Sequence, residues 1–149
     1  MEIIKGRQNT SGEYPSLLKK RALTALKWAK RAFKEGDYDI AVNNAEYAVQ
    51  LYVKSIIYRI LGEERSCHDI RSLLGVLASA LIEQGLNEEA NLVIDFIRAN
   101  RRPIAELSDA HTRAMYGLFE YGEKEAKILI KIAEDIIEML QTLEEKIFG

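Results

Sequence analysis

The residues best suited to chemistry in this chain are two arginines and a histidine in the stretch RRPIAELSDAH, residues 101–111. An arginine that holds a phosphate beside a histidine that moves a proton is a combination that can cleave a phosphodiester. On a helix the two side chains share a face when about seven residues, or about 700°, separate them. Arg102 instead lies nine residues before His111, about 900° away, with Pro103 between them. The spacing argues against a cleaving pair, and Arg101 and Arg102 remain candidates for binding phosphate.

The second histidine, His68, precedes an expected helix, where bonding to the loop backbone is its favoured role. Metal binding is not expected at either histidine. Di-iron bundles use Glu-x-x-His, whereas the residues three before His68 and His111 are Arg65 and Ser108. With two histidines and the single Cys67, a zinc site is not expected either. Since no glycine-rich phosphate loop is present, we predict no cofactor.

The composition is typical of one soluble helical domain. A chain of 149 residues with 48% hydrophobic residues is long enough to bury a core. We expect residues 1–15 to form a flexible N-terminal arm and residues 16–149 a single helical-bundle domain. One cysteine leaves no internal disulfide, which favours a cytoplasmic location. No apolar run reaches the roughly 18 residues that span a bilayer, so no membrane association is expected.

Charge is unevenly distributed, although the net charge is only −2. Residues 1–34 carry nine lysines and arginines against two acids, and residues 117–149 carry four against eight. Such a split can form a basic face for an acidic partner, protein or RNA, or it can be the solvated side of ordinary helices. Trp28 is expected in the core or at an interface.

Apolar residues at helical spacing run through most of the chain. The first stripe, made of small residues, follows Ser16 as the expected cap and ends at a turn containing Gly36. A second helix is expected at residues 38–61, with Gly62 as its stop. Two long helices joined by a short turn predict an antiparallel hairpin, and the alanines along both let them approach closely.

The remaining segments also have helical periodicity. A third helix should begin near Asp69 and end at Gly85, and a fourth should follow from Asn87. Pro103 should break or restart the fourth helix, leaving a short segment after it. A last helix is expected at about residues 123–146. Because no segment alternates with period two, the sequence predicts an all-α fold, an up-and-down bundle of four to five antiparallel helices.

The stretch GDYDIAVNNAEYAVQLYVKSIIYRILG, followed by CHDIRSLL, resembles the HEPN family. The positions that carry the resemblance are a Gly-Asp-Tyr turn, spaced alanines with a lysine, a glycine, and a histidine before a leucine-rich helix. Here they are Gly36, Asp37, Tyr38, Ala41, Ala45, Ala48, Lys54, Gly62, His68 and Leu73. The later stretch DAHTRAMYGLFEYGEKEAKILIKIAEDIIEML resembles the family's last segment through Arg113 and Tyr116. It departs from the family at residues 115–117, where many relatives carry Arg-Tyr-Pro. The resemblance covers about residues 17–145.

The resemblance implies a HEPN-like bundle, often dimeric and commonly partnered with a small nucleotidyltransferase. Some members are ribonucleases, the toxin halves of toxin–antitoxin pairs, and others are thought to bind nucleotides. The ribonucleases carry Arg, four to six residues, then His, and neither histidine here has that arginine. We therefore expect a module without nuclease activity that acts as a homodimer, with a nucleotidyltransferase partner, and binds nucleotide or RNA phosphate. Its candidate contacts are Lys54, His68, Arg101, Arg102, His111 and Arg113, and no catalytic residue is assigned.

Two alternatives stay open. One is a divergent HEPN ribonuclease or toxin that brings His111 to Arg101 or Arg102 across the Pro103 break or across a dimer. The other is a helical-repeat-like scaffold for protein interactions, because AFKEGDYDIAVNNAEYAV and LIEQGLNEEANLVIDFI look alike. The glycines of these two stretches, Gly36 and Gly85, are 49 residues apart rather than the roughly 34 of a tetratricopeptide repeat.

Overall fold

The computed structural model describes residues 12–67, 69–116 and 120–149. At positions 111 and 114–116 it describes the backbone only. Over this part of the chain the protein is all helical, as predicted, with six helices and no strand. The helices are α1 (Glu13–Lys34), α2 (Tyr38–Leu61), α3 (Ile70–Glu83), α4 (Asn87–Ala99), α5 (Arg101–Tyr116) and α6 (Glu123–Phe148). Within the described ranges no helix is both long and apolar enough to cross a bilayer.

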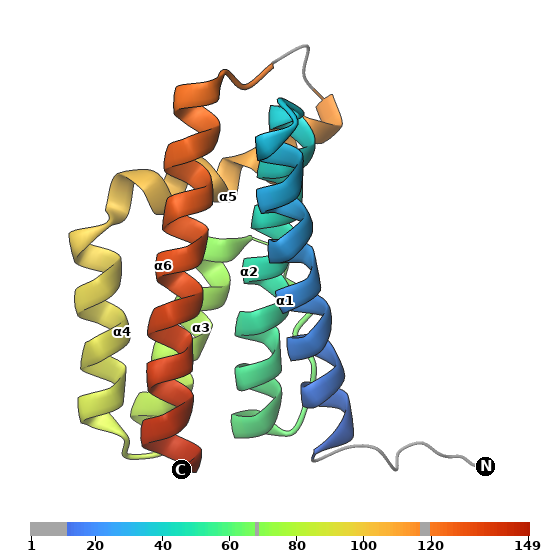
Figure 1. Cartoon of the computed structure of the whole chain (residues 1–149). Helices are drawn as coiled ribbons and strands as arrows, with labels where there is room; N and C mark the ends of the chain where they lie inside the picture. Colours follow the sequence, from blue (N-terminus) through green and yellow to red (C-terminus); the bar gives the residue numbers. More distant parts are fainter. Residues whose placement is uncertain (1–11, 68, 117–119) are drawn as a thin grey trace.

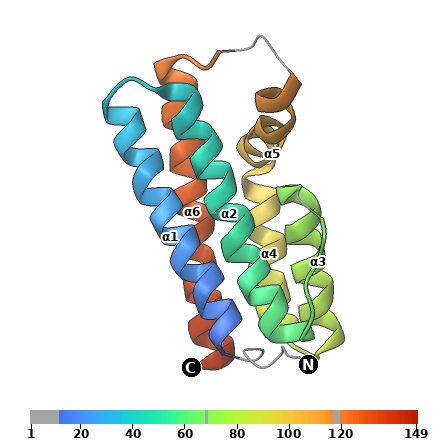
Figure 2. The same ribbon diagram turned by 90° about the vertical axis from the view of Figure 1, so that its right-hand side faces the viewer.

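The first two helices form the predicted antiparallel hairpin, α1 against α2 (Figures 1 and 2). The turn between them passes through Gly36 at φ +82°, in the left-handed region that glycine adopts without steric cost. α2 has the predicted bounds and ends on Gly62, at φ +77°. Most alanines predicted along the seam are fully buried, namely Ala22, Ala29, Ala41, Ala45 and Ala48, whereas Ala25 is 6% exposed and Ala32 is half-buried. Their short side chains allow the two backbones to pack closely.

The other four helices complete the bundle around a common core. α6 packs against α1, α2, α4 and α5, and α3 and α4 form a second antiparallel pair (Figure 1). α5 lies across one end of that pair instead of alongside it, and it also packs against α2 and α6 (Figures 1 and 2). Large side chains with less than 2% exposure come from four helices: Tyr52, Ile56, Leu73, Leu77, Ile104, Leu107, Ile136 and Leu140.

Two details differ from the sequence predictions, and a third prediction is narrowed. Ser16 is not the cap of α1, because the helix begins at Glu13, and Pro15 fits its first turn, where the missing N–H has no helical partner. The break expected at Pro103 lies at Asn100, and the chain restarts as α5 at Arg101 with Pro103 in its first turn. α5 has 16 residues, so the segment after the break is longer than predicted, and the described residues form six helices instead of four to five. Trp28, expected in the core or at an interface, is 47% exposed and so does not lie in the core.

A buried carboxylate ties the end of α6 to α1 and α2. Glu144 is only 9% exposed and accepts a hydrogen bond from the hydroxyl of Tyr52, which is fully buried. The Nζ of Lys19 lies 3.3 Å from Oε1 of Glu144, and Nη1 of Arg59 lies 3.9 Å from its Oε2. Burial, and then the hydrogen bond to Glu144, raises the pKa of Tyr52, so the tyrosine stays a hydrogen-bond donor in the folded protein.

Candidate functional site

Arg101, the first residue of α5, lies at the edge of a groove between α3, α4 and α5. The groove has a volume of about 440 Å³ and is lined by Arg71, Leu74, Ile97, Arg101, Ile104 and Ala105. Leu74 and Ile104 are 0% and 1% exposed and form the floor, whereas Arg71 and Arg101 are exposed at the rim. A cavity of this volume is in the range that holds small ligands.

The two guanidinium groups make this groove cationic. Nη2 of Arg71 lies 3.7 Å from Oδ1 of Asp109, but both side chains are more than half exposed, so solvent weakens the ion pair. Arg101 has no hydrogen-bond or ion-pair partner in the part of the chain that the structure describes. A guanidinium presents paired donors that match the oxygens of a phosphate or carboxylate. The groove is therefore suited to an anionic group attached to an apolar or planar body.

Asp69 holds the start of α3 against α5 and so positions the two arginines. Its carboxylate accepts hydrogen bonds from the backbone N–H of Ser72 at 3.3 Å, from the Ser72 hydroxyl at 2.9 Å, and from the hydroxyl of Ser108 on α5. Ser108 is 4% exposed, and its oxygen accepts from the backbone N–H of Arg71 at 3.4 Å. The helices that carry Arg71 and Arg101 are thus joined by a partly buried polar contact.

The same contacts set the ionisation of Asp69. Burial by itself would raise the pKa of this carboxyl, but the hydrogen bonds from Ser108 and Ser72 outweigh burial and lower the pKa below its ordinary value of 3.8. The folded state therefore favours the charged form. The stabilisation is fully present above the unfolded-state pKa and is lost as the pH falls through the folded-state pKa.

Replacing Asp69 with alanine should lower the free energy of unfolding by about 1–2 kcal/mol, because α3 loses its N-cap and Ser108 loses its acceptor. Asp69→Asn should keep part of the capping of α3, because the amide oxygen can still accept a hydrogen bond, but the side chain no longer changes its charge with pH. Urea denaturation from about pH 7 down to about pH 3 tests this, and the wild type should lose stability more steeply below about pH 4 than Asp69→Asn. Asp95→Asn, at an exposed position on α4, is the matched control. Equal acid slopes in wild type and Asp69→Asn would contradict the role given to this carboxylate.

Comparison with known proteins places the chain in a family. A family model described as HEPN domain matches residues 15–145. The chain belongs to the HEPN domain family. No curated protein and no solved structure matches it. The resemblance predicted from the sequence is confirmed, and the match includes every residue that lines the α3–α4–α5 groove.

The HEPN bundle separates the two arginines that the sequence places together. Arg102 is 91% exposed, and its Nε lies 3.8 Å from Oε2 of Glu106, one turn further along α5. Consecutive helical residues point about 100° apart, so Arg101 reaches the groove while Arg102 faces solvent. Lys54, another predicted contact, is half-buried on α2 and is not among the residues that line the groove.

The other predicted contacts either do not line the groove or have side chains that the structure does not describe. His68 is beyond the described residues, and for His111 only its place in α5 is described. Arg113 is exposed near the end of α5 and lies close to Tyr121. Burial raises the pKa of Tyr121, and Arg113 opposes that rise. The backbone N–H of Tyr121 donates to Oδ1 of Asp39 on α2 at 2.8 Å. Because Arg113 lies close to Tyr121, just before α6, it lies where α5, α2 and α6 meet.

Sequence reasoning missed Arg71, which supplies half of the charge in the groove. The sequence could have placed Arg71 only in the first turn of α3, two residues after the cap at Asp69. That position says nothing about α5, which reaches Arg71 only because it crosses the end of α3 (Figure 2). Among the residues described, no three histidine, cysteine, aspartate or glutamate side chains gather closely enough to hold a metal ion.

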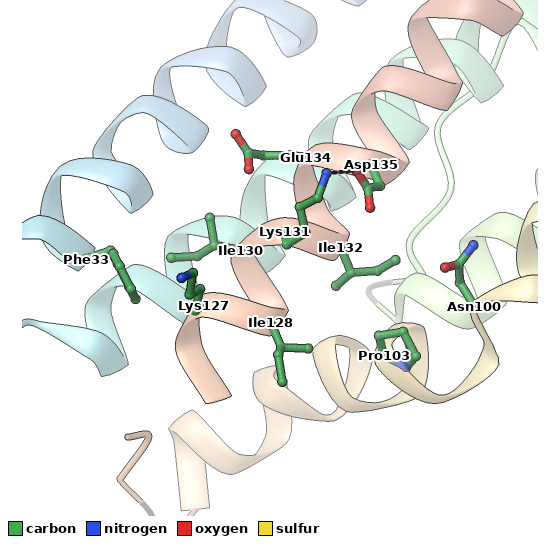
Figure 3. A pocket seen from close by; sticks show the side chains of 10 residues that line it. All are labelled: Phe33, Asn100, Pro103, Lys127, Ile128, Ile130, Lys131, Ile132, Glu134 and Asp135. Atoms are coloured by element: carbon green, nitrogen blue, oxygen red, sulfur yellow. Dashed lines mark hydrogen bonds and ion pairs between the residues drawn. The ribbon is translucent and has the colours of Figure 1, made fainter. Parts of the chain in front are cut away.

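A larger hollow of about 560 Å³ lies between the end of α1, the start of α5 and the first half of α6 (Figure 3). Its apolar lining includes Phe33, Pro103 and Ile128, and the side chain of Ile128 is 55% exposed. Two of its charged residues neutralise each other, since Nζ of Lys131 lies 2.8 Å from Oδ1 of Asp135 (Figure 3). This apolar surface suits contact with a protein better than it suits a phosphate.

Proposed function

We propose that this HEPN-type module binds a phosphate-bearing ligand, a nucleotide or RNA, in the α3–α4–α5 groove without cleaving it. The observation that carries the proposal is the guanidinium of Arg101, which has no partner among the described residues, beside Arg71 and above the apolar floor of Leu74 and Ile104. The phosphate binds at the arginines, and the base or sugar covers the floor.

The geometry of α5 supports binding without hydrolysis. α5 is one helix from Arg101 to Tyr116, so successive residues keep the helical step of about 100° across Pro103. Along it Arg102 lies about 900° and Arg101 about 1000° before His111, and neither angle is a whole number of turns. Arg102 is also held by Glu106. A ribonuclease built on the Arg and His of one protomer is therefore disfavoured.

In this proposal the module also forms a homodimer and binds a nucleotidyltransferase. The support is the exposed apolar surface around Ile128, which a partner would remove from water (Figure 3). Sedimentation equilibrium tests the dimer, and co-purification with a nucleotidyltransferase encoded beside this chain tests the partner. A monomer at every concentration, or no co-purification, would contradict the corresponding part.

Binding of adenosine monophosphate tests the groove. Arg101→Ala and Arg71→Ala should each weaken it at least about tenfold, because hydrogen bonds to charged groups contribute about 1.5–3 kcal/mol. Arg102→Ala removes the same charge from the neighbouring position and should leave the affinity unchanged. The measurement is the shift of backbone amide resonances during titration with the nucleotide and, separately, with inorganic phosphate.

Two results would overturn the proposal. One is an equal loss of affinity in Arg102→Ala, or no binding of either ligand by the wild type. The other is cleavage of RNA by the wild type that is lost in His111→Ala, which would favour the ribonuclease alternative.

A further inference from the structure

Of the six described helices, α1 has the largest excess of lysine and arginine over acidic residues, seven against Glu13 alone. Between Pro15 and Lys34 there are seven lysines and arginines and no acidic residue. The buried side of α1 is apolar and faces α2 and α6, so most of these cations are exposed. The exposed ones are Lys20, Arg21, Lys27, Lys30, Arg31 and Lys34. The chain as a whole has a net charge of −2, so the outer face of α1 is a local concentration of positive charge.

Four exposed cations of this face have no carboxylate partner in the described ranges: Lys20, Arg21, Lys27 and Lys34. Three of them, Lys20, Lys27 and Lys34, share one side of the helix. They follow one another at seven-residue steps, which places them in one row along the helix, about 21 Å from first to last. Lys30 and Arg31 differ, because Nζ of Lys30 lies 2.6 Å from Oε2 of Glu134 on α6 and Nε of Arg31 lies 3.7 Å from Oε2 of Glu35. The row is therefore available to an external polyanion.

The same face has shallow hollows and an exposed aromatic ring. Two adjoining hollows, of about 530 and 480 Å³, are lined by α1 and the residue after it, and both include Leu23 and Lys27. Trp28 is 47% exposed, with Nζ of Lys27 at 5.3 Å and Cζ of Arg31 at 5.6 Å from its ring centroid. Cations beside an open indole combine phosphate binding with a surface on which a base stacks.

We propose that this face of α1 binds single-stranded nucleic acid, with phosphates on the row of Lys20, Lys27 and Lys34 and a base stacked on Trp28. The site goes beyond the proposed function, because α1 packs on α2 and α6 whereas the groove lies between α3, α4 and α5. A loss of binding in the groove leaves this site intact, so the two proposals fail separately.

The chemistry of the face favours nucleic acid over two other anionic partners. An acidic protein helix needs a continuous apolar stripe to dock against. Leu17, Leu23 and Trp28 are six and five residues apart, so they point in different directions around α1 and form no stripe. A membrane-bound helix turns its apolar face to the lipid, but the apolar face of α1 is buried in the bundle. Phosphates need only spaced cations and an aromatic ring, which this face supplies.

The test measures binding of a mixed-sequence 12-nucleotide RNA, and of the matching DNA, as a function of salt. Trp28 is the only tryptophan, so quenching of its emission reports stacking at this position. Changing Lys20, Lys27 and Lys34 together to glutamine should raise Kd at least about tenfold and reduce the slope of log Kd against log salt by about 2. Trp28→Leu should raise Kd by about 5- to 150-fold.

The matched control is a triple variant on α6 that changes the net charge equally at exposed positions and should leave Kd unchanged. Its substitutions are Lys124→Gln, Lys127→Gln and Lys146→Gln. Equal effects of the two triples, or no quenching of Trp28 by either oligonucleotide, would overturn the proposal. So would displacement of the RNA by polyglutamate at equal charge, which would indicate an acidic protein. Binding to phosphatidylserine vesicles with a blue shift of Trp28 and no RNA binding would indicate a membrane instead.

Discussion

Replacing Leu140 with alanine is expected to lower the free energy of unfolding by about 2–5 kcal/mol. Leu140 has no exposed surface, and it lies on α6, which packs against four other helices. The change removes buried methyl groups and leaves a cavity that helices joined on several sides fill only in part. For a chain of this length the melting temperature should fall by roughly 4–20 °C. Urea denaturation and a thermal melt followed by circular dichroism measure both quantities.

Leu23→Ala is the matched control for this change. The chemistry is identical, but Leu23 is 39% exposed on α1, so the loss should stay below about 0.5 kcal/mol. A cost below about 1 kcal/mol for Leu140→Ala, or equal costs at the two positions, would be inconsistent with α6 at the centre of the core.

Replacing Glu144 with leucine is expected to cost about 1–3 kcal/mol, mainly because the buried hydroxyl of Tyr52 loses its acceptor. The two cations at Glu144 contribute less, since the side chains of Lys19 and Arg59 are 42% and 37% exposed and return to water. Chemical denaturation of both this variant and Glu145→Leu, at the exposed neighbour, measures the difference.

A double-mutant cycle isolates the contact between the two buried partners. Tyr52→Phe combined with Glu144→Leu removes donor and acceptor together and should be more stable than the sum of the single changes predicts. Strict additivity of the two single changes would show that the hydroxyl and the carboxylate are not coupled, against the contact in the structure.

The position of α5 connects the fold to the groove. α5 lies across the end of the α3–α4 pair (Figure 2). Its first residue, Arg101, therefore reaches the same groove as Arg71 at the start of α3. The contact between Asp69 and Ser108 holds these two helices together. The prediction for Asp69→Ala therefore has a second consequence, because loosening this contact should also weaken nucleotide binding in the groove.

Local signals in the amino-acid sequence were enough to place most helices of this HEPN domain. The bounds of α2 follow from its 3.6-residue periodicity and from Gly62, and the start of α3 follows from the cap at Asp69. The buried alanine seam of α1 and α2 was also predictable. Each of these features depends on residues within one or two helical turns of each other, so the amino-acid sequence alone is enough to predict it.

Contacts between helices decide the rest. The pairing of Arg71 with Arg101 in one groove, the separation of Arg101 from Arg102, and the contact of Tyr52 with Glu144 over 92 residues of sequence all depend on how helices cross. Crossing is set by the fit of many side chains over several surfaces, and no single spacing reports it. The residues that form the groove are for that reason apparent only once α5 is seen to lie across α3 and α4.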